Sequence, residues 1–205
     1  RFCAQRHGPM SDKMPRYEAL PIVRLLVDER LLAPDAYVFW AGGEPTLLPD
    51  FDESLELMML YGQTRNEVAT NATILSQAIL RNLAPDGRLS LKTSIDCGTR
   101  DTFKRLKRAD LFDQVWEHLA IYARTGGAVG AKYIISIDNI DRVELDGFVG
   151  HARRAGIQQA HVHMDHNMPA ADIQEAHIAA AAYLYRKLLS SGITTACGVH
   201  STGSM

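Results

Sequence analysis

Short apolar runs alternate with longer stretches of helical periodicity along almost the whole chain, and this alternation constrains the fold more than any other feature. Short apolar runs bounded by turn residues are typical of buried strands, whereas apolar residues every three to four positions are typical of helices. We expect strands at residues 37–41, 66–70, 89–95, 131–137, 157–164 and 194–199. We expect helices at residues 17–32, 51–61, 74–83, 102–107, 112–124, 143–155 and 171–190.

Such an alternation predicts an α/β fold, with a parallel sheet and helices packed outside it. Because crossovers between parallel strands are right-handed, the carboxyl ends of all the strands lie on one rim. Five of the expected strands end in clusters of carboxylate, amide and small residues, and the rim is where α/β barrels carry their chemistry. The sequence therefore predicts a partial barrel over residues 1–200, followed by a tail at 201–205. The alternative is that these clusters are ordinary polar turns.

Composition excludes some classes of function. The chain has 205 residues, of which 46% are hydrophobic and 22% charged, as in an ordinary globular domain. A formal net charge of −2 gives no electrostatic argument for binding nucleic acid or an anionic membrane. No apolar run approaches the roughly 18 residues that a membrane span needs. We therefore expect neither nucleic acid nor a membrane as a partner.

The cysteines do not indicate a disulfide framework. Cys3, Cys97 and Cys197 are odd in number and far apart in the sequence. A reducing, cytoplasmic setting is the expectation for such a chain. No complete cysteine motif for a metal lies within the 205 residues.

The stretch from residue 37 to residue 45 is where the first of these strands meets the rim. Its apolar run stops at Gly42-Gly43-Glu44-Pro45. Glycines let the backbone turn sharply and approach a ligand closely, and proline stiffens the exit. Glu44 then stands at a strand tip, where it can accept hydrogen bonds from a bound amine. A turn with a solvated glutamate is the alternative.

The alternation of side chains within three strands predicts a polar inner face. Polar residues share one face of each strand, and the apolar residues between them share the other. Lysines and histidines turned inward need water, partners or a ligand. We expect a lumen open to a polar ligand, lined by Ser90, Lys92, Ser94, Asp96, Lys132, Ile134, Ser136, Asp138, His161, His163 and Asp165. The apolar set, which includes Leu89, Leu91, Ile95, Tyr133, Ile135, Ile137, Val162 and Met164, is expected to pack under the helices.

His161, His163 and Asp165 also allow a different interpretation. Imidazole and carboxylate groups suit zinc or iron, and residues two apart on one strand can share a metal. A metal-dependent barrel hydrolase or lyase is therefore an alternative function. Contacts between these side chains and a substrate are the preferred interpretation.

Taken together, the motifs resemble those of the radical S-adenosylmethionine (radical SAM) superfamily. The resemblance rests on motifs that follow one another in the family's order, strand by strand. They are Gly42-Gly43-Glu44-Pro45, Thr70-Asn71-Ala72-Thr73, Ser94-Ile95-Asp96 and Lys132-Tyr133-Ile134. Members of this family typically build a six-stranded partial barrel.

The family's defining motif is C-x3-C-x2-C with an aromatic residue before the third cysteine, and only Phe2-Cys3 matches its end. Three thiolates hold three irons of a [4Fe–4S] cluster and leave the fourth iron for the cofactor. We expect the first two cysteines, and the first strand of the barrel, to precede Arg1 in the full-length protein. By itself this stretch of 205 residues is not expected to bind a cluster well. A cluster-less relative that binds a nucleotide or peptide is the alternative.

The resemblance also implies roles for residues. Cys3 would be the third cluster ligand, and the backbone at Phe2 would contact the adenine. The cofactor would be held by a further set of rim residues: Gly42, Gly43, Glu44, Pro45, Asn71, Ser94, Asp96 and Lys132. Within this set Lys132 would pair with the cofactor's carboxylate, a sensible charge match. His161, His163 and Asp165 would face the substrate.

The activity implied by the resemblance is reductive cleavage of S-adenosylmethionine at a [4Fe–4S] cluster. The resulting 5′-deoxyadenosyl radical would abstract a hydrogen atom from a small-molecule or peptide substrate. A one-electron donor such as flavodoxin or ferredoxin would be the partner. Fold analogy cannot choose the substrate.

Overall fold

The computed structural model describes residues 18–165 and 167–198, and within them strands and helices alternate as predicted. The strands are β1 (Tyr37–Trp40), β2 (Arg65–Ala69), β3 (Leu89–Ser94), β4 (Ala128–Ile135), β5 (Gln159–Met164) and β6 (Thr194–Gly198). The α-helices are α1 (Ala19–Asp28), α2 (Phe51–Leu60), α3 (Gln77–Asn82), α4 (Arg100–Lys107), α5 (Phe112–Ala123), α6 (Arg142–Arg154) and α7 (Glu175–Ser190). Short 3₁₀ helices η2 (Pro45–Leu47) and η3 (Ala170–Asp172) lie in two connections.

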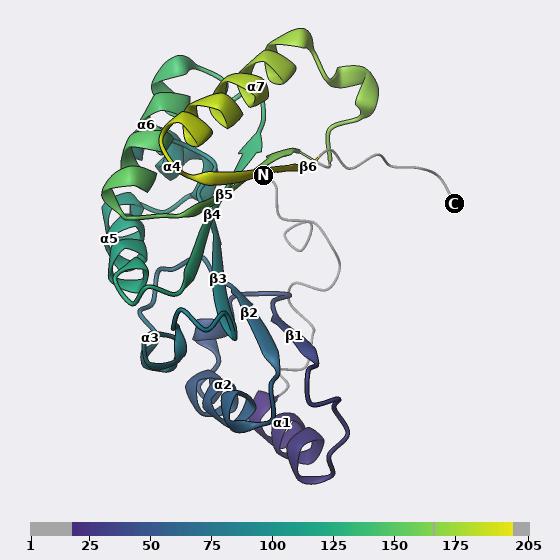
Figure 1. Cartoon of the computed structure of the whole chain (residues 1–205). Helices are drawn as coiled ribbons and strands as arrows, with labels where there is room; N and C mark the ends of the chain where they lie inside the picture. The colour runs from purple at the N-terminus through teal and green to yellow at the C-terminus, as the bar shows by residue number, and fades with distance from the viewer. Residues whose placement is uncertain (1–17, 166, 199–205) are drawn as a thin grey trace.

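The strands form one parallel sheet in the order β1-β2-β3-β4-β5-β6. Each strand is paired with its neighbours in the sequence, and β1 and β6 form the two edges of the sheet in the described part of the chain. Helices α2, α3, α5 and α6 cover one face, while the opposite, concave face carries none of the labelled helices (Figure 1). The prediction of a partial α/β barrel with parallel strands and outer helices is confirmed, and the sheet is not closed.

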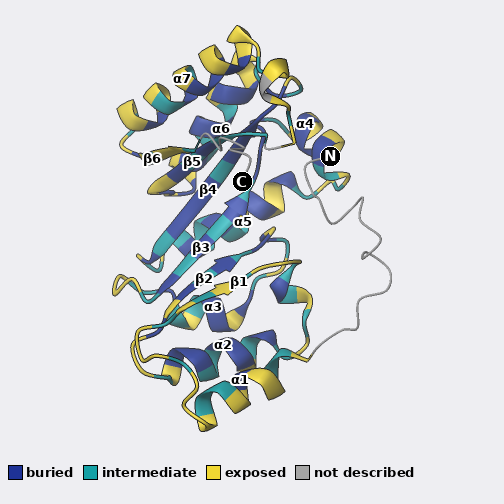
Figure 2. Ribbon diagram, turned by 90° about the vertical axis from the view of Figure 1, so that its right-hand side faces the viewer, coloured by how far each residue is buried: buried dark blue, intermediate teal, exposed yellow. Residues whose placement is uncertain are grey.

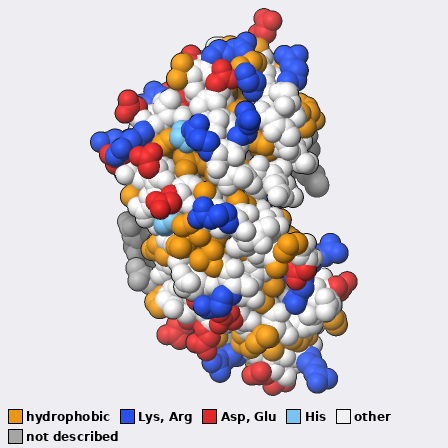
Figure 3. Space-filling view, turned by 60° about the vertical axis from the view of Figure 1, so that its left-hand side comes forward, with side chains coloured by type: hydrophobic (Ala, Val, Ile, Leu, Met, Phe, Trp, Pro, Cys, Tyr) orange, Lys and Arg blue, Asp and Glu red, His pale blue; other side chains and the backbone are white. Residues whose placement is uncertain are grey.

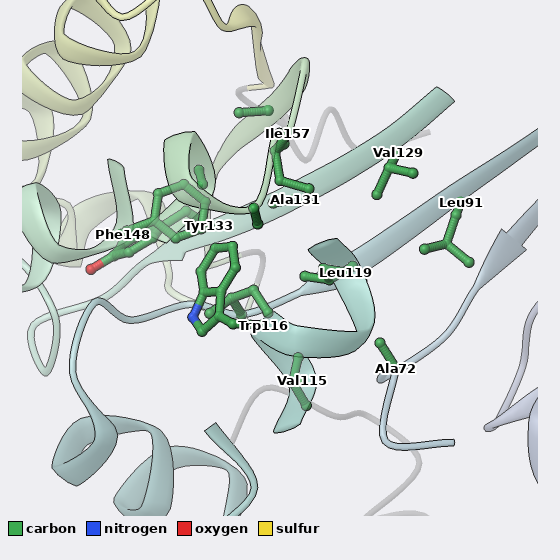
Figure 4. Packing of buried hydrophobic residues seen from close by; sticks show 14 of the residues in the cluster. Ala72, Leu91, Val115, Trp116, Leu119, Val129, Ala131, Tyr133, Phe148 and Ile157 are labelled. Atoms are coloured by element: carbon green, nitrogen blue, oxygen red, sulfur yellow. The ribbon is translucent and has the colours of Figure 1, made fainter. Parts of the chain in front are cut away.

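The hydrophobic core lies between the outer face of the sheet and the helices. Leu89 and Leu91 of β3 are no more than 1% exposed, and so are Tyr133 of β4 and Phe148 of α6. The rings of Tyr133 and Phe148 meet edge to face with their centroids 5.0 Å apart (Figure 4). Figure 2 shows the same division, with buried residues on the sides of the helices that face the sheet and exposed residues outside. Six members of the predicted apolar set are thus confirmed in the core: Leu89, Leu91, Ile95, Tyr133, Ile135 and Val162. Met164 of the same set is only partly buried and also lines the cavity on the inner face.

Strand β4 starts three residues before the predicted position and ends two residues earlier. Its pairing with β3 already begins at Ala128, opposite Ser90. At its other end the buried Asn139 side chain donates to the Ile134 carbonyl at 2.7 Å and accepts from the Ser136 N–H at 2.8 Å. The Asn139 amide thereby makes the backbone hydrogen bonds that a neighbouring strand would make if β4 continued. The expectation that Ile137 packs under the helices is wrong, because it lies beyond this stop and is 58% exposed.

The last predicted helix is also shorter than expected. Helix α7 begins at Glu175, and η3 occupies part of the stretch before it. The Gln174 side chain accepts from the His177 N–H, and the Gln174 N–H donates to His177 Nδ1 at 3.0 Å. This reciprocal pair is a capping box, which satisfies two backbone donors at the start of a helix. The alanine-rich composition before Gln174 concealed this start.

Helix α6 approaches the loop after β3 closely because two glycines meet. A Cβ atom on Gly147 would lie 2.5 Å from the carbonyl oxygen of Gly98, and one on Gly98 would lie 2.0 Å from the carbonyl oxygen of Glu144. The Glu144 carboxylate then reaches the Gly98 N–H at 2.7 Å and the Thr99 hydroxyl at 2.6 Å. The loop at the carboxyl end of β3 is therefore fixed from behind by α6.

This contact predicts opposite effects for two substitutions in one helix. Gly147→Ala is expected to lower the free energy of unfolding by about 1–3 kcal/mol, because the new methyl group meets backbone atoms that cannot move aside. Gly150→Ala is the matched control, because its nearest atom is the flexible end of Arg154 at 3.4 Å. It should stabilise the protein by about 0.5–1 kcal/mol through helix propensity alone. Urea unfolding of both variants tests this, and equal stabilisation by both would contradict the contact.

Candidate active site at the rim of the sheet

A cavity of about 910 Å³ lies on the inner face of the sheet and reaches its carboxyl-end rim. It is bounded by residues from β1 to β5, from the loops after β1 and β2, and from α4 and the turn after it. The lining residues are Phe39, Gly42, Gly43, Glu44, Glu67, Ala69, Thr70, Asn71, Thr73, Lys92, Thr93, Ser94, Phe103, Lys107, Ala109, Lys132, Ile134, His161, His163 and Met164. By contrast, the outer face mixes acidic and basic side chains without a surface of one sign (Figure 3).

The two glycines after β1 leave open space at the edge of the cavity. Gly42 has a φ angle of +94°, which favours glycine, and both Gly42 and Gly43 line the cavity. A Cβ atom built on either would meet no other atom within 4 Å. Any side chain at these positions would occupy space that a ligand could use. Pro45 follows as a buried residue at the start of η2 and does not line the cavity.

Glu44 ties two rim loops together. Its Oε1 accepts from the Thr46 N–H at 3.3 Å, the Thr46 hydroxyl at 2.7 Å and the Thr70 hydroxyl at 2.6 Å. Its Oε2 accepts from the Asn71 N–H at 2.6 Å, the only donor to this oxygen among the described residues. A carboxylate oxygen can accept about two hydrogen bonds. Glu44 is therefore first a clamp between the loops after β1 and β2, and Oε2 retains capacity for one ligand donor.

Asn71 shapes the second of these loops. Its Oδ1 accepts from the Thr73 N–H at 2.8 Å and from the Thr73 hydroxyl at 2.6 Å. Local hydrogen bonds of this kind stabilise a turn. Ala72 between them adopts a φ angle of +56°, and its carbonyl oxygen contacts His118 Nδ1 at 2.8 Å. The motif Thr70-Asn71-Ala72-Thr73 is thus a fixed turn at the rim rather than a loose loop.

Three predicted residues from neighbouring strands lie side by side on the inner face. Ser94 of β3 is in register with Lys132 of β4, which is in register with His161 of β5. All three line the cavity, together with His163. Lys92 is paired with Glu67 and Lys107 with Asp96. Lys132, by contrast, forms no ion pair with any described residue. A row of one hydroxyl, one ammonium and one imidazole group therefore faces the same space.

Asp96 does not line the cavity, and the expectation that it shares the polar inner face is wrong. It is 1% exposed with a φ angle of +65°. Its Oδ1 accepts from the Ile134 N–H at 2.8 Å and its Oδ2 from Lys107 Nζ at 2.5 Å. The left-handed turn at Asp96 directs the carboxylate between β3 and β4 instead of into the lumen. Asp96 acts on the site by holding Lys107 of α4 at the cavity wall.

Sequence reasoning missed Lys107, and with it Phe103 and Ala109. These residues lie on α4 or just after it, where a helical pattern gave no reason to expect a wall of the cavity. The sequence signal that could have revealed Lys107 was Asp96. A carboxylate that is buried needs a charged or hydrogen-bonding partner, and the next basic residues in the chain are on this helix. Glu67 of β2 and Phe39 of β1 also line the cavity, and neither belongs to a motif that pointed to the rim.

The histidine pair stays near the cavity, but Asp165 does not join it. The rings of His161 and His163 are stacked with centroids 6.2 Å apart. The pKa of His161 is lowered by burial and by Lys92 and Lys132, against an opposing effect of Glu67. Asp165 Oδ1 accepts from the Asn167 N–H at 2.9 Å and so closes its own turn.

The alternative of a metal site finds no support in the structure. Within residues 18–165 and 167–198, no group of three or more His, Cys, Asp or Glu side chains is arranged to hold a metal ion. Cys97 is buried away from the cavity lining, where burial raises the pKa of its thiol, and Cys197 is exposed elsewhere. Cys3 and Phe2 lie outside the described residues.

None of the described helices is long and apolar enough to cross a bilayer.

An open parallel α/β barrel with a polar rim cavity is the class that fold and site define. The sequence matches the family model described as the radical SAM superfamily over residues 1–150, and the chain belongs to that superfamily. This confirms the resemblance inferred from the motifs. The cofactors of this family, S-adenosylmethionine and a [4Fe–4S] cluster, are those that the motifs predicted.

Curated relatives are similar over part of their length. A probable GTP 3′,8-cyclase of Saccharolobus solfataricus is 28% identical over 121 residues, which are 59% of this chain and 39% of the relative. Its counterpart in Saccharolobus islandicus is 27% identical over the same shares. The matched region thus spans about two fifths of these relatives.

Solved structures share the fold. Streptococcus suis SuiB bound to S-adenosylmethionine superposes with a TM-score of 0.64 at 12% identity, covering 94% of this chain and 45% of SuiB. The enzyme anSMEcpe with bound AdoMet gives a TM-score of 0.66 at 13% identity, covering 96% of this chain and 58% of that one. A radical SAM methyltransferase from Sphaerobacter thermophilus gives 0.59 at 16% identity, covering 89% and 55%.

The Glu44 clamp predicts a measurable cost for an isosteric change. Glu44→Gln is expected to lower the free energy of unfolding by about 1–3 kcal/mol, since either orientation of the amide turns its NH₂ group toward a backbone N–H. The amide of Asn71 should also exchange faster with deuterium. The control is Glu56→Gln, because Glu56 forms an exposed ion pair with Arg81 that is worth about 0–1 kcal/mol. Equal stability of the two variants would show that Glu44 is no clamp.

Proposed function

We propose that this chain is the core of a radical SAM enzyme and that its rim cavity holds S-adenosylmethionine. The observation that carries the proposal is that Gly42, Ser94 and Lys132, which come from separate loops and strands, line one cavity. Family membership supports the same reaction class. Because the matched region spans only part of the curated relatives, the activity is proposed for the full-length protein.

The residues present fit the amino-acid part of the cofactor. The open space at Gly42 and Gly43 admits a ligand next to Glu44 Oε2, which can accept from the cofactor's amino group. Lys132 has no acidic partner in the described chain and can pair with the cofactor's carboxylate. Ser94 and Asn71 bound the same space. Asp96 and Pro45 support the wall from behind without facing the cavity.

When bound, S-adenosylmethionine and a reduced [4Fe–4S] cluster supply a 5′-deoxyadenosyl radical for hydrogen abstraction. In the proposal Cys3 is one ligand of the cluster and the backbone at Phe2 contacts the adenine. The rest of the site orients the reacting groups and excludes water, which is the protein's part in cofactor enzymes. The fixed loops at Glu44 and Asn71 give that orientation a rigid frame.

The substrate is proposed to enter next to His161 and His163, which line the inner part of the cavity. A small molecule or a peptide fits the comparisons, since the curated relatives are named for GTP and SuiB has been solved with its precursor peptide SuiA. A one-electron donor of the flavodoxin or ferredoxin kind is the proposed partner. GTP is the first substrate to try, because it is named for the curated relatives.

The decisive experiment uses the full-length protein, reconstituted anaerobically with iron and sulfide. We expect an iron–sulfur absorption band and, after reduction, release of 5′-deoxyadenosine from S-adenosylmethionine. Lys132→Met should raise the dissociation constant for S-adenosylmethionine roughly 10- to 100-fold, the effect of losing a charge-assisted hydrogen bond. Lys104→Met is the control, because Lys104 is exposed beside Asp110 and does not line the cavity.

The opposite results would overturn the proposal. An intact cluster without 5′-deoxyadenosine would exclude the activity. Equal affinities of the two lysine variants would exclude the role of Lys132. If the gene encodes no cysteines upstream of Arg1, a cluster-less binding domain becomes the better explanation.

A further inference from the structure

Lys92 stands between two positions of the sheet that carry little or no side chain. In the register of the sheet its neighbours are Ala69 on β2 and Gly130 on β4. The Lys92 side chain lines the cavity and is 37% exposed. It lies two residues before Ser94, and therefore one step further from the rim than the row of Ser94 and Lys132. Small residues on both sides leave room around this lysine.

The space beside Lys92 reaches His161. A Cβ atom at Gly130 would lie 3.5 Å from Lys92 Cγ and 3.8 Å from His161 Cδ2. The Lys92 stem and the His161 ring therefore both pack near Gly130, and both side chains line the same cavity. The two groups are close enough for one ligand in the cavity to contact both.

Glu67 holds the Lys92 ammonium group in place without using all its donors. The two groups are 2.8 Å apart, and the Glu67 side chain is only 13% exposed. Glu67 also lies near Tyr37 of β1, whose pKa is raised by burial and by this carboxylate. An ammonium group has three N–H donors, so a single bond to Glu67 leaves others for the cavity. Glu67 therefore fixes the position of the Lys92 ammonium group while leaving some of its N–H donors available.

The charges around this space favour an anion. Lys92 and Lys132 both bring positive charge near His161, and Glu67 is the acidic group that opposes them there. Burial and the two lysines lower the pKa of His161, which disfavours the protonated ring. A bound anion would offset the lysines and allow the ring to take a proton. Lys92 therefore adds positive charge to the part of the cavity that His161 lines.

We propose that Lys92 and His161, which line the same cavity and both pack near Gly130, bind an anionic group of the substrate, either a phosphate or a carboxylate. The proposal rests on the proposed function in that it takes the same cavity as the reaction site. It separates two tasks, with Lys132 near the rim for the cofactor and Lys92 one row deeper for the substrate. Substrates without an anionic group would lack this anchor.

The test follows the His161 ring by nuclear magnetic resonance in the full-length protein labelled at histidine. Inorganic pyrophosphate and succinate serve as probes for the two anion classes. We expect at least one of them to raise the pKa of His161 in a saturable manner, because an anion stabilises the charged imidazole. His161→Gln assigns the resonance. Neither anion changing the titration would overturn the proposal.

Variants then show whether the anion binds at the proposed place. Lys92→Gln should weaken binding of the active probe about tenfold or more, whereas Lys92→Arg, which keeps the charge, should retain most of it. Gly130→Val should also weaken binding, because its methyl groups would crowd the Lys92 stem and the His161 ring, and circular dichroism checks that each variant is folded. Lys104→Gln is the control, since it removes an exposed positive charge outside the cavity. Equal affinity of Lys92→Gln and Lys104→Gln would overturn the assignment.

Anion binding at Lys92 and cleavage of S-adenosylmethionine can be lost independently of each other. Anion binding needs neither the cluster nor S-adenosylmethionine, and it is read at His161 rather than as a reaction product. If S-adenosylmethionine binds and is cleaved while no anion affects His161, the substrate anchor is wrong and the function stands. If the anion binds through Lys92 while no cleavage occurs, the reverse holds. Binding of only pyrophosphate or only succinate identifies the substrate class.

Discussion

The register of β3, β4 and β5 is the constraint on which the site depends. Parallel pairing places Ser94, Lys132 and His161 at one level on three adjacent strands. Because alternate side chains share a face, the same pairing sends Tyr133 and Val162 into the core behind them. A slip of one residue in any of these strands would exchange the two sets. The core therefore selects the one arrangement in which the polar groups meet.

The sequence was sufficient for the architecture because strands and helices differ in period and are separated by clear turn residues. The sequence was less informative about the ends of strands and helices where a single side chain sets the boundary. The end of β4 depends on Asn139, and the start of α7 depends on Gln174 and His177. Such contacts are made by single side chains, which leave no periodic signal. The errors at residues 131–137 and 171–190 are of this kind.

Alternation, which depends only on strand parity, correctly placed six residues at the cavity: Lys92, Ser94, Lys132, Ile134, His161 and His163. Ser90, Ser136 and Asp138, expected on the same face, do not line it. Alternation failed where the backbone leaves the strand conformation, as at Asp96 with its left-handed turn, and at Asp165 in its own turn. It was silent on Lys107, which reaches the cavity from a helix through a buried acid. The sequence predicted Glu44 at the rim, but its role as a clamp needed the positions of Thr46, Thr70 and Asn71.

The pairing of Lys107 with Asp96 has a consequence for how this cavity can adapt. Withdrawing the ammonium group toward a ligand would leave a carboxylate that is 1% exposed without its cation, and a buried unpaired charge is severely disfavoured. Lys107 is therefore expected to stay at the cavity wall instead of moving toward a ligand. Adjustment to ligands of different shape is left to the loop after β1, where Gly42 and Gly43 border open volume at the edge of the cavity.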